Sequence, residues 1–314
     1  MSYQPLPFGV SRVLIVKQMG SKSNSSSRPK VACEIATDRI LAGRVTETSS
    51  VDCAAQAIAA GAIVPDLTEP NIRDRNAVYR ALHDVLDSVS GRATDVVAVL
   101  PDASVRVVLL DFETLPTKRD EAEGVIRFRL KKSLPFDLDK ARVSYHSEPA
   151  TSGVRVVAAV ALTSVVEEYE SLFREAGYNP GVVLPSTLAS LGAASGERPT
   201  LVVKVDARTT SIAILAQKQL LLFRALENSS GINISAERLA EEVYPSVVFF
   251  QDTYNLNIDQ IFVSGLPHAR EAAPALQAQT GAEVHDLVGS LPVEKTSGSV
   301  PKWQVAGVVG ALIS

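Results

Sequence analysis

The sequence opens the same structural pattern twice, and this repeat restricts the folds that the chain can adopt. Apolar residues on both sides of a turn at Thr37 and Asp38 predict a β-hairpin over residues 33–45. A second strand–turn–strand unit follows over residues 201–224. After each hairpin, helical and strand-like segments alternate. Two such halves indicate a duplicated α/β fold.

Each half continues with elements of both kinds. In the first half, the apolar spacing predicts a helix at residues 75–90, ended by Gly91, and a buried strand at residues 95–100, ended by Pro101. In the second half we expect a helix at 234–254 that is kinked or broken near Pro245, a strand at 260–264, a helix at 269–279, a strand at 283–287, a loop at 289–299 and a helix at 303–313.

Between the halves lies a segment with the element order β-α-β-β-α. Its predicted strands are at 105–110, 142–146 and 154–162, and its predicted helices at 119–132 and 164–176. This order is typical of a small inserted domain. We therefore expect four parts: a flexible N-terminal segment at 1–28, a first domain from 29–103 and 300–314, an inserted subdomain at 104–184, and a second domain at 185–299.

The composition argues against several classes of function. The 314 residues, 46% of them apolar and 21% charged, suit about two globular domains. A net charge of −4 gives no bulk electrostatic reason to bind nucleic acid or anionic lipid. Cys33 and Cys53 are too few for a disulfide framework or a metal cluster, and the four histidines lack metal-ligand spacing. We expect no metal site and no catalytic residue.

The N-terminal segment carries no targeting signal that we recognise. It lacks the basic and apolar regions of a secretory leader, and no run reaches the roughly 20 apolar residues that span a bilayer. The serine-rich run at 21–27 should be mobile. Residues 10–16 suit an added edge strand better than an interfacial anchor, because no basic face accompanies them. We expect a cytoplasmic protein by default, and a peripheral membrane association through a partner stays open.

Four stretches have the order and spacing of one known family. They lie at residues 96–116, at 125–136 with the turn Leu134-Pro135-Phe136 at its end, at 167–180, and at 303–313. Together they resemble the PilM pilus-assembly family of the actin-like ATPase superfamily, which is similar to the cell-division protein FtsA. The resemblance covers nearly everything after residue 30. It implies an actin-like (ribonuclease H-like) duplicated two-domain fold with an inserted subdomain of the 1C type.

The resemblance also implies a nucleotide site, and there the sequence departs from the family. Actin-like ATPases hold phosphate and Mg²⁺ with two glycine-containing hairpin turns that each begin with Asp. Here the first turn has Glu34, Ala36 and Thr37, so glutamate replaces the aspartate and alanine the glycine. A glycine leaves room for phosphate at the backbone N–H groups, and a side chain takes that room away.

The other two turns depart in the same way. In the second, Lys204 replaces the metal-side carboxylate and Asp206 stands at the glycine position, followed by Thr209 and Thr210. The third turn, on the adenosine side, is Ser264-Gly265-Leu266-Pro267, in which proline lacks the N–H of a glycine. An Asp206 facing the phosphates would repel them. We expect ATP and Mg²⁺ binding to be weak or lost.

Simpler interpretations of these residues stay open. Thr209 and Thr210 also suit ordinary strand positions. Lys204 also suits a strand residue that points to the surface, or an ion pair with Asp206 or Glu34. The alternative for the whole protein is an active ATPase of the PilM or FtsA kind, in which the nucleotide controls partner binding or polymerisation.

The resemblance implies a role and a partner. We expect a pseudo-ATPase scaffold in the inner-membrane platform of a type IV pilus or a related secretion machine. In that family the cytoplasmic tail of a PilN-like membrane protein enters a cleft beside the 1C subdomain. Leu134, Pro135 and Phe136 are candidates for lining this cleft, although a helix stop packed into the local core is the simpler explanation for them.

One basic run remains unassigned. Four cations fall within six residues near the end of the predicted helix at 119–132; they are Arg127, Arg129, Lys131 and Lys132. Such a run is a candidate binding face, and its ordinary explanation is a solvated helix surface.

Overall fold

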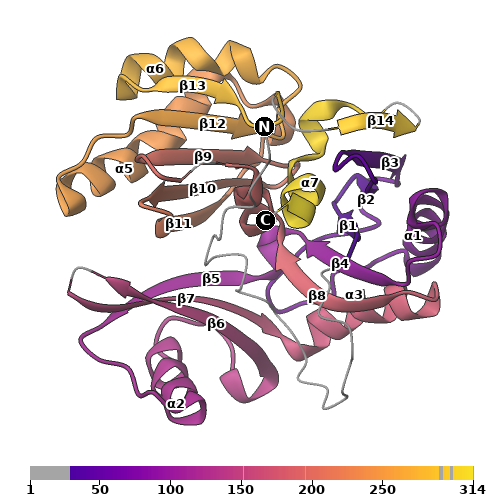
Figure 1. The fold of residues 1–314 in the computed structure, drawn as a ribbon, viewed down its shortest axis with the longest axis horizontal. Coiled ribbons are helices and arrows are strands. Elements are labelled where there is room, and N and C mark those ends of the chain that lie inside the picture. The colour runs from indigo at the N-terminus through magenta and orange to yellow at the C-terminus, as the bar shows by residue number, and fades with distance from the viewer. Residues whose placement is uncertain (1–28, 151, 195, 290–292, 298–299, 314) are drawn as a thin grey trace.

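The structure is a computed structural model, and it describes residues 29–150, 152–194, 196–289, 293–297 and 300–313. The proposed strand at 10–16, the serine run at 21–27 and the flexibility expected for 1–28 lie outside the described residues. The strands form three sheets, with the six-stranded sheet to the right, the five-stranded sheet to the upper left and the three-stranded sheet below in Figure 1.

The sheets are built as follows. The six-stranded sheet has the order β14 (Val293–Ser297), β3 (Val51–Ala57), β2 (Arg39–Val45), β1 (Val31–Ile35), β4 (Asp95–Leu100), β8 (Asn179–Pro185). The five-stranded sheet has the order β11 (Gln219–Glu227), β10 (Thr209–Ala216), β9 (Thr200–Val205), β12 (Gln260–Ser264), β13 (Glu283–Asp286). The three-stranded sheet has the order β5 (Arg106–Phe112), β7 (Gly153–Leu162), β6 (Ala141–Ala150).

The pairing confirms the duplication. In the first half β1 is antiparallel to β2 and parallel to β4. In the second half β9 is antiparallel to β10 and parallel to β12. The central strands β1 and β9 are buried along their whole length, as continuous apolar runs in parallel sheets require.

Seven helices cover the three sheets in the described part of the chain. Two pairs pack on the six-stranded sheet: α1 (Arg75–Ser90) with α3 (Thr163–Glu175), and α4 (Ser186–Ser190) with α7 (Ala306–Ile313). The five-stranded sheet carries α5 (Ala236–Tyr254) and α6 (Ala273–Thr280). On the three-stranded sheet, α2 (Arg119–Leu130) buries Ala122, Ile126 and Leu130. Each amphipathic helix therefore places its apolar stripe on a sheet.

Two strands lie in a different sheet from the one that the expected boundaries imply. The expected boundaries place β8 in the inserted subdomain and β14 in a loop of the second domain. Both strands instead belong to the six-stranded sheet. Both are edge strands, where a polar or proline-containing sequence is tolerated. Pro180 and Gly181 in β8, and the polar sequence of β14, therefore hide these strands from pattern reading.

The predicted break near Pro245 is wrong. The helix α5 runs through this residue without interruption. Pro245 removes one backbone hydrogen bond, but it lies on the exposed side of the helix, where solvent satisfies the freed carbonyl. The segment predicted as one helix at 269–279 begins as a 3₁₀ turn, Ala269–Ala272, before α6.

The crossing of α4 and α7 depends on a glycine. A Cβ added at Gly310 would lie 2.3 Å from the carbonyl oxygen of Ala189, which is backbone and cannot move away. We expect Gly310→Ala to lower the free energy of unfolding by about 1–3 kcal/mol, measured by urea denaturation. Gly124→Ala is the control, because Gly124 in α2 faces open space. It should raise stability by about 0.5–1 kcal/mol. Equal effects of the two changes would contradict this packing.

Candidate functional site

Polar residues converge where parallel strands end between the two larger sheets. Glu34 lies at the carboxyl end of β1, and Asp102 directly follows β4. Ser186 begins α4 directly after β8, and Lys204 lies at the carboxyl end of β9. The carboxyl ends of parallel strands are the usual position of binding sites in α/β proteins. We call Glu34, Asp102, Ser186, Thr187, Lys204 and Ser211 the inter-sheet polar cluster.

An ion pair forms the centre of this cluster. The Nζ atom of Lys204 lies 3.2 Å from Oε1 of Glu34, with side-chain exposures of only 6% and 4%. The hydroxyl of Ser186 donates to the same Oε1. On the other side, a Cβ added at Gly307 would lie 2.6 Å from Oε2 of Glu34, so only glycine leaves room for the carboxylate.

Both members of the pair are charged. Burial pushes the pKa of Glu34 upward, but the positive charges of Lys204 and Arg39 outweigh it, and the pKa lies below its usual value. Burial pushes the pKa of Lys204 downward, but the charges of Glu34, Asp102 and Asp206 outweigh it, and the pKa lies above its usual value. Each charge therefore depends on the other for compensation away from water.

The second carboxylate of the cluster holds the start of α4. Asp102, 2% exposed, accepts hydrogen bonds from the backbone N–H of Thr187 at 2.9 Å and from the hydroxyls of Thr187 and Ser211. Burial raises the pKa of Asp102, and the charge of Lys204 opposes this shift. Glu34 and Asp102 thus fix the first two residues of α4, Ser186 and Thr187, to strand ends of the six-stranded sheet. Lys204 and Ser211 link the same two carboxylates to the five-stranded sheet.

Asp206 does not face outward from its turn. Its carboxylate accepts from the backbone N–H groups of Arg208 at 2.7 Å and Thr209 at 2.8 Å, and from the Thr209 hydroxyl at 2.7 Å. The side chain thereby caps the β9–β10 turn, a common role of aspartate. Thr209 and Thr210 are buried residues at the start of β10, as their strand interpretation expects.

The first and third turns are also closed by internal contacts. In the first, the N–H of Ala36 donates to the carbonyl of Arg39, and Thr37 lies within that turn. In the third, Gly265 has φ +81°, and an added Cβ would lie 1.8 Å from the carbonyl oxygen of Val205. Its N–H donates to the carbonyl of Trp303. Gly265 thus lets the third turn pack against the second.

Two other residues of the third turn are buried in the protein. Leu266 is 6% exposed and belongs to the core of the five-stranded sheet. Ser264 is buried, and its hydroxyl has no hydrogen-bond partner within the described ranges.

The structure decides between several sequence interpretations. The ion pair of Lys204 with Glu34 is confirmed, and a surface-pointing Lys204 is wrong. Asp102, Ser186, Thr187 and Ser211 were missed. A usable signal was present for Asp102, because it follows the buried strand β4 within two residues, at the carboxyl end. Ser186 and Thr187 follow β8, which the sequence pattern does not reveal. Ser211 lies inside an apolar strand and gave no such signal.

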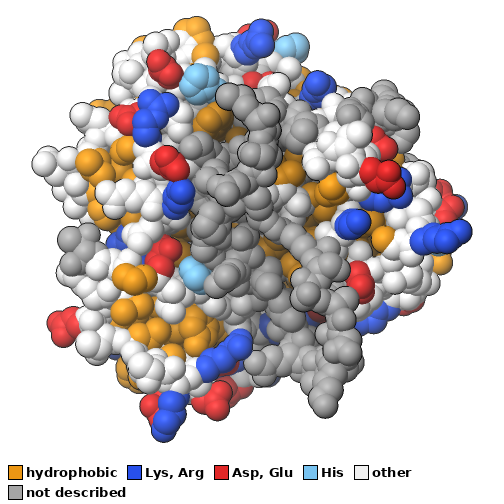
Figure 2. Space-filling view, viewed as in Figure 1, with side chains coloured by type: hydrophobic (Ala, Val, Ile, Leu, Met, Phe, Trp, Pro, Cys, Tyr) orange, Lys and Arg blue, Asp and Glu red, His pale blue; other side chains and the backbone are white. Residues whose placement is uncertain are grey.

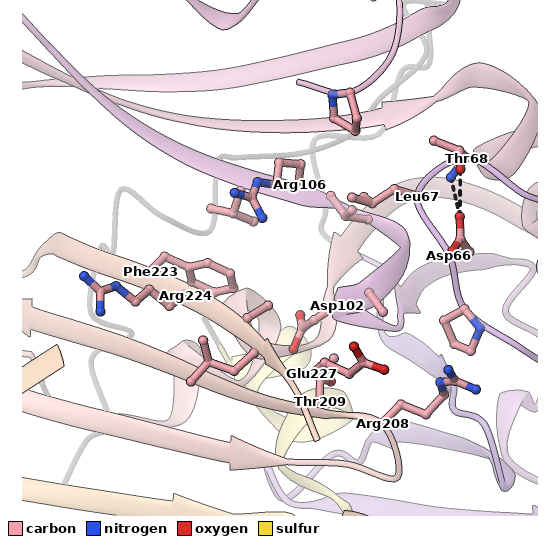
Figure 3. A pocket seen from close by; sticks show the side chains of 17 residues that line it. Asp66, Leu67, Thr68, Asp102, Arg106, Arg208, Thr209, Phe223, Arg224 and Glu227 are labelled. Atoms are coloured by element: carbon pink, nitrogen blue, oxygen red, sulfur yellow. Dashed lines mark hydrogen bonds between the residues drawn. The ribbon is translucent and has the colours of Figure 1, made fainter. Parts of the chain in front are cut away.

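A groove opens beside the cluster. Its cavity of about 720 Å³ lies between β5 and β11, with Arg106 on one side and Phe223 on the other (Figure 3). Both strands end their sheets, so within the described chain each has an edge without a strand partner. The other lining residues are Pro65, Asp66, Leu67, Thr68, Asp102, Ala103, Val105, Val107, Pro135, Arg208, Thr209, Arg224, Ala225, Leu226 and Glu227.

One wall of the groove is fixed in advance. The carboxylate of Glu168 on α3 accepts from the backbone N–H groups of Asn71 and Ile72 at 2.8 and 2.9 Å. The fully buried Asn71 side chain donates to the carbonyls of Asp66 and Glu69. These bonds hold the loop that presents Leu67 to the groove.

The residues of the turn that follows α2 lie in two different environments. Pro135 is exposed and lines the groove. Leu134 and Phe136 are half-buried and pack on the core of the three-stranded sheet instead. Pro135 therefore lines a groove, and the local-core interpretation applies to its two neighbours.

Two other kinds of site are not found in the described part of the chain. No three His, Cys, Asp or Glu side chains are grouped as a metal site would require. Among the helices described, none combines the length and the apolar character needed to cross a membrane.

Comparison with known proteins identifies the fold. No protein-family model matches the chain, and no curated protein matches its sequence. A chain of the PilM–PilN type IV pilus biogenesis complex matches with a TM-score of 0.73 and 17% identity, covering 91% of this chain and 97% of the other. The fold is therefore actin-like, and the resemblance to the PilM family is confirmed at the level of the fold.

Two further solved structures share this architecture more distantly. The cytoplasmic domain of EpsL, an inner-membrane component of the type II secretion system of Vibrio cholerae, matches with a TM-score of 0.53 and 12% identity over 90% of this chain and 94% of its own. The ethanolamine utilization protein EutJ of Carboxydothermus hydrogenoformans matches with a TM-score of 0.51 and 11% identity over 92% of each chain.

Removing the charge of Lys204 tests the cluster. We expect Lys204→Met to lower the free energy of unfolding by about 3–5 kcal/mol, because Glu34 then stays buried without a counter-charge. The double variant Glu34→Gln/Lys204→Met should recover most of this loss. Lys218→Met, which breaks an exposed pair with Glu197, is the control and should cost about 0–1 kcal/mol. If Lys218→Met and Lys204→Met lowered the denaturation midpoint by the same amount, the buried ion pair would be refuted.

Proposed function

We propose that this protein is a nucleotide-independent, PilM-like scaffold of a type IV pilus or related secretion platform. In this proposal it binds the cytoplasmic tail of a PilN-like membrane protein, which holds it at the inner membrane. The observation that carries the proposal is the match of nearly the whole chain to a chain of the PilM–PilN complex. The groove supports the proposed peptide binding, and the inter-sheet polar cluster supports the proposed independence from nucleotide.

The fold family implies Mg²⁺ and ATP, and the residues present do not fit a metal. The Glu34 carboxylate stands where the family has a metal-side aspartate, but its Oε1 is bonded to Lys204 and Ser186. The ammonium of Lys204 places a positive charge at this carboxylate, and it would repel a divalent cation. A side chain thus supplies the positive charge that a metal would bring.

The residues present do not fit phosphate either. Phosphate needs free backbone N–H groups at the turns. In the second turn the N–H groups of Arg208 and Thr209 are bonded to the Asp206 carboxylate, which is itself an anion. In the first turn the N–H of Ala36 is bonded within the hairpin. We therefore assign no step to a nucleotide.

Calorimetry tests the loss of nucleotide binding. Titration of millimolar Mg·ATP into the full chain should give no heat of binding, because the N–H groups of Ala36, Arg208 and Thr209 already have partners and Lys204 lies at the Glu34 carboxylate. A micromolar dissociation constant in the wild type that weakens in Lys204→Met would show instead that Lys204 contacts nucleotide, and would return the active ATPase as the better function.

The groove suits an extended peptide. The free edges of β5 and β11 offer backbone N–H and carbonyl groups to an added strand, and the groove walls read its side chains. Apolar contacts come from Leu67, Pro135 and Phe223. Because the Leu67 loop is held by Asn71 and Glu168, little ordering is needed when a peptide binds.

Peptide binding can be measured directly. A labelled synthetic peptide of the PilN-like tail encoded by the neighbouring gene should bind the full chain in fluorescence anisotropy. Leu67→Asp should weaken binding about tenfold or more by placing a charge in the groove wall. Leu256→Asp, at an exposed site beyond the groove, is the matched control and should bind normally. Peptide affinity that is absent, or untouched by Leu67→Asp, would count against the groove.

A further inference from the structure

The helix α2 has an outer face that the fold does not use. Its inner face is buried on the three-stranded sheet through Ala122, Ile126 and Leu130. On the outer face, Val125 is 38% exposed and Phe128 is 69% exposed. Phe128 is the most exposed of the large hydrophobic side chains in the described ranges. Val125 and Phe128 are three residues apart, so they are neighbours on the helix surface and form a small exposed apolar patch.

Three cations lie close to Phe128 in the sequence, and the side chain of Lys132 lies beside its ring. The guanidinium of Arg129 instead lies 5.9 Å from the centre of the Phe112 ring. Arg129, Lys131 and Lys132 are exposed, and none of them forms an ion pair within the described part of the chain. The Nζ atom of Lys132 lies 5.9 Å from the centre of the Phe128 ring. Cations at a helix C-terminus also stabilise the helix dipole, but that role does not explain an exposed phenylalanine among them.

The acidic residues near α2 leave this end net positive. At the start of the helix, Glu121 pairs with Lys118 at 3.0 Å and Glu123 with Arg127 at 2.9 Å. After the helix, Asp137 caps the backbone N–H of Asp139, and Lys140 follows. The uncompensated positive charge therefore lies beside Phe128.

The position of α2 allows contact with a flat surface. The helix lies at the lower end of the molecule, on the side of the three-stranded sheet away from the two larger sheets (Figure 1). Acidic and basic side chains are interspersed over the visible face (Figure 2), and the whole chain carries a net charge of −4. Attraction to an anionic surface would therefore be local, as at the basic end of α2.

We propose that Val125, Phe128, Arg129, Lys131 and Lys132, the α2 docking face, rest on an anionic lipid bilayer. The Phe128 ring would enter the headgroup region, while the long basic side chains stay at the level of the lipid phosphates. A bilayer offers both an apolar layer and a dense negative charge at fixed depths, which matches a protruding ring with cations near it. One ring and three cations give only weak binding alone.

Weak binding is sufficient if a second contact exists. A partner tail in the groove would raise the local concentration of the α2 docking face at the membrane. The docking face does not require that partner, however, and it can be measured in the isolated protein. A negative vesicle experiment and a negative peptide experiment are therefore separate results.

Vesicle co-sedimentation of the full chain tests the docking face. The wild type should bind phosphatidylcholine vesicles that contain one third phosphatidylglycerol at low salt, and should not bind pure phosphatidylcholine. Lys131→Glu/Lys132→Glu and, separately, Phe128→Ser should each reduce the bound fraction about fivefold or more. Phe249→Ser is the matched control, because this ring is also exposed, at 46%, but lies on α5. It should bind like the wild type.

A spectroscopic readout reports the insertion itself. In Phe128→Trp, the emission added to that of Trp303 should shift to shorter wavelength on anionic vesicles and not on neutral ones. The inference is overturned if the wild type does not sediment with anionic vesicles. It is equally overturned if the Lys131/Lys132 and Phe128 variants, folded by circular dichroism, bind as well as the wild type. If the wild type does not sediment with anionic vesicles, an acidic protein becomes the better candidate to bind the α2 docking face.

Discussion

The buried ion pair between Glu34 and Lys204 is the interaction on which the arrangement of the two larger sheets depends. Removing two charges from water costs several kcal/mol for each ion, and their attraction offsets this cost only in good geometry. Here one charge comes from β1 of the six-stranded sheet and the other from β9 of the five-stranded sheet. A small movement that separates the sheets weakens this attraction before water can reach the charges, so the pair opposes opening.

The same pair organises its surroundings. Ser186 bonds to Glu34, and Thr187 to Asp102, so α4 begins at a fixed point between the sheets. Gly307 and Gly310 let α7 pack closely against Glu34 and α4. Asp102 also lines the groove, which places the proposed peptide site in direct contact with the cluster. Stability of the junction and shape of the groove are therefore coupled through a few side chains.

The sequence pattern predicted most of the fold, because the central strands are continuous apolar runs and their hairpins recur. It missed the edge strands β8 and β14, because edge strands tolerate proline and polar residues. It also missed the interior strand β3, whose sequence has a single β-branched residue. Only part of the site was predictable. Lys204 and Glu34 were visible as departures from a family pattern, but choosing between a surface lysine and an ion pair needs contacts 170 residues apart in the chain. The capping role of Asp206 changes the physical reason for its expected effect. The carboxylate still disfavours phosphate, but mainly because it occupies the amides that phosphate would need.

The central claim is that a lysine holds the junction closed without nucleotide. Hydrogen–deuterium exchange at the backbone amides of α4 and α7 tests this most directly, in the wild type and in Lys204→Met, each with and without millimolar Mg·ATP. The account predicts slow exchange in the wild type that Mg·ATP does not change, and faster exchange in Lys204→Met that Mg·ATP does not reverse. Slower exchange of the wild-type junction on addition of Mg·ATP would contradict it.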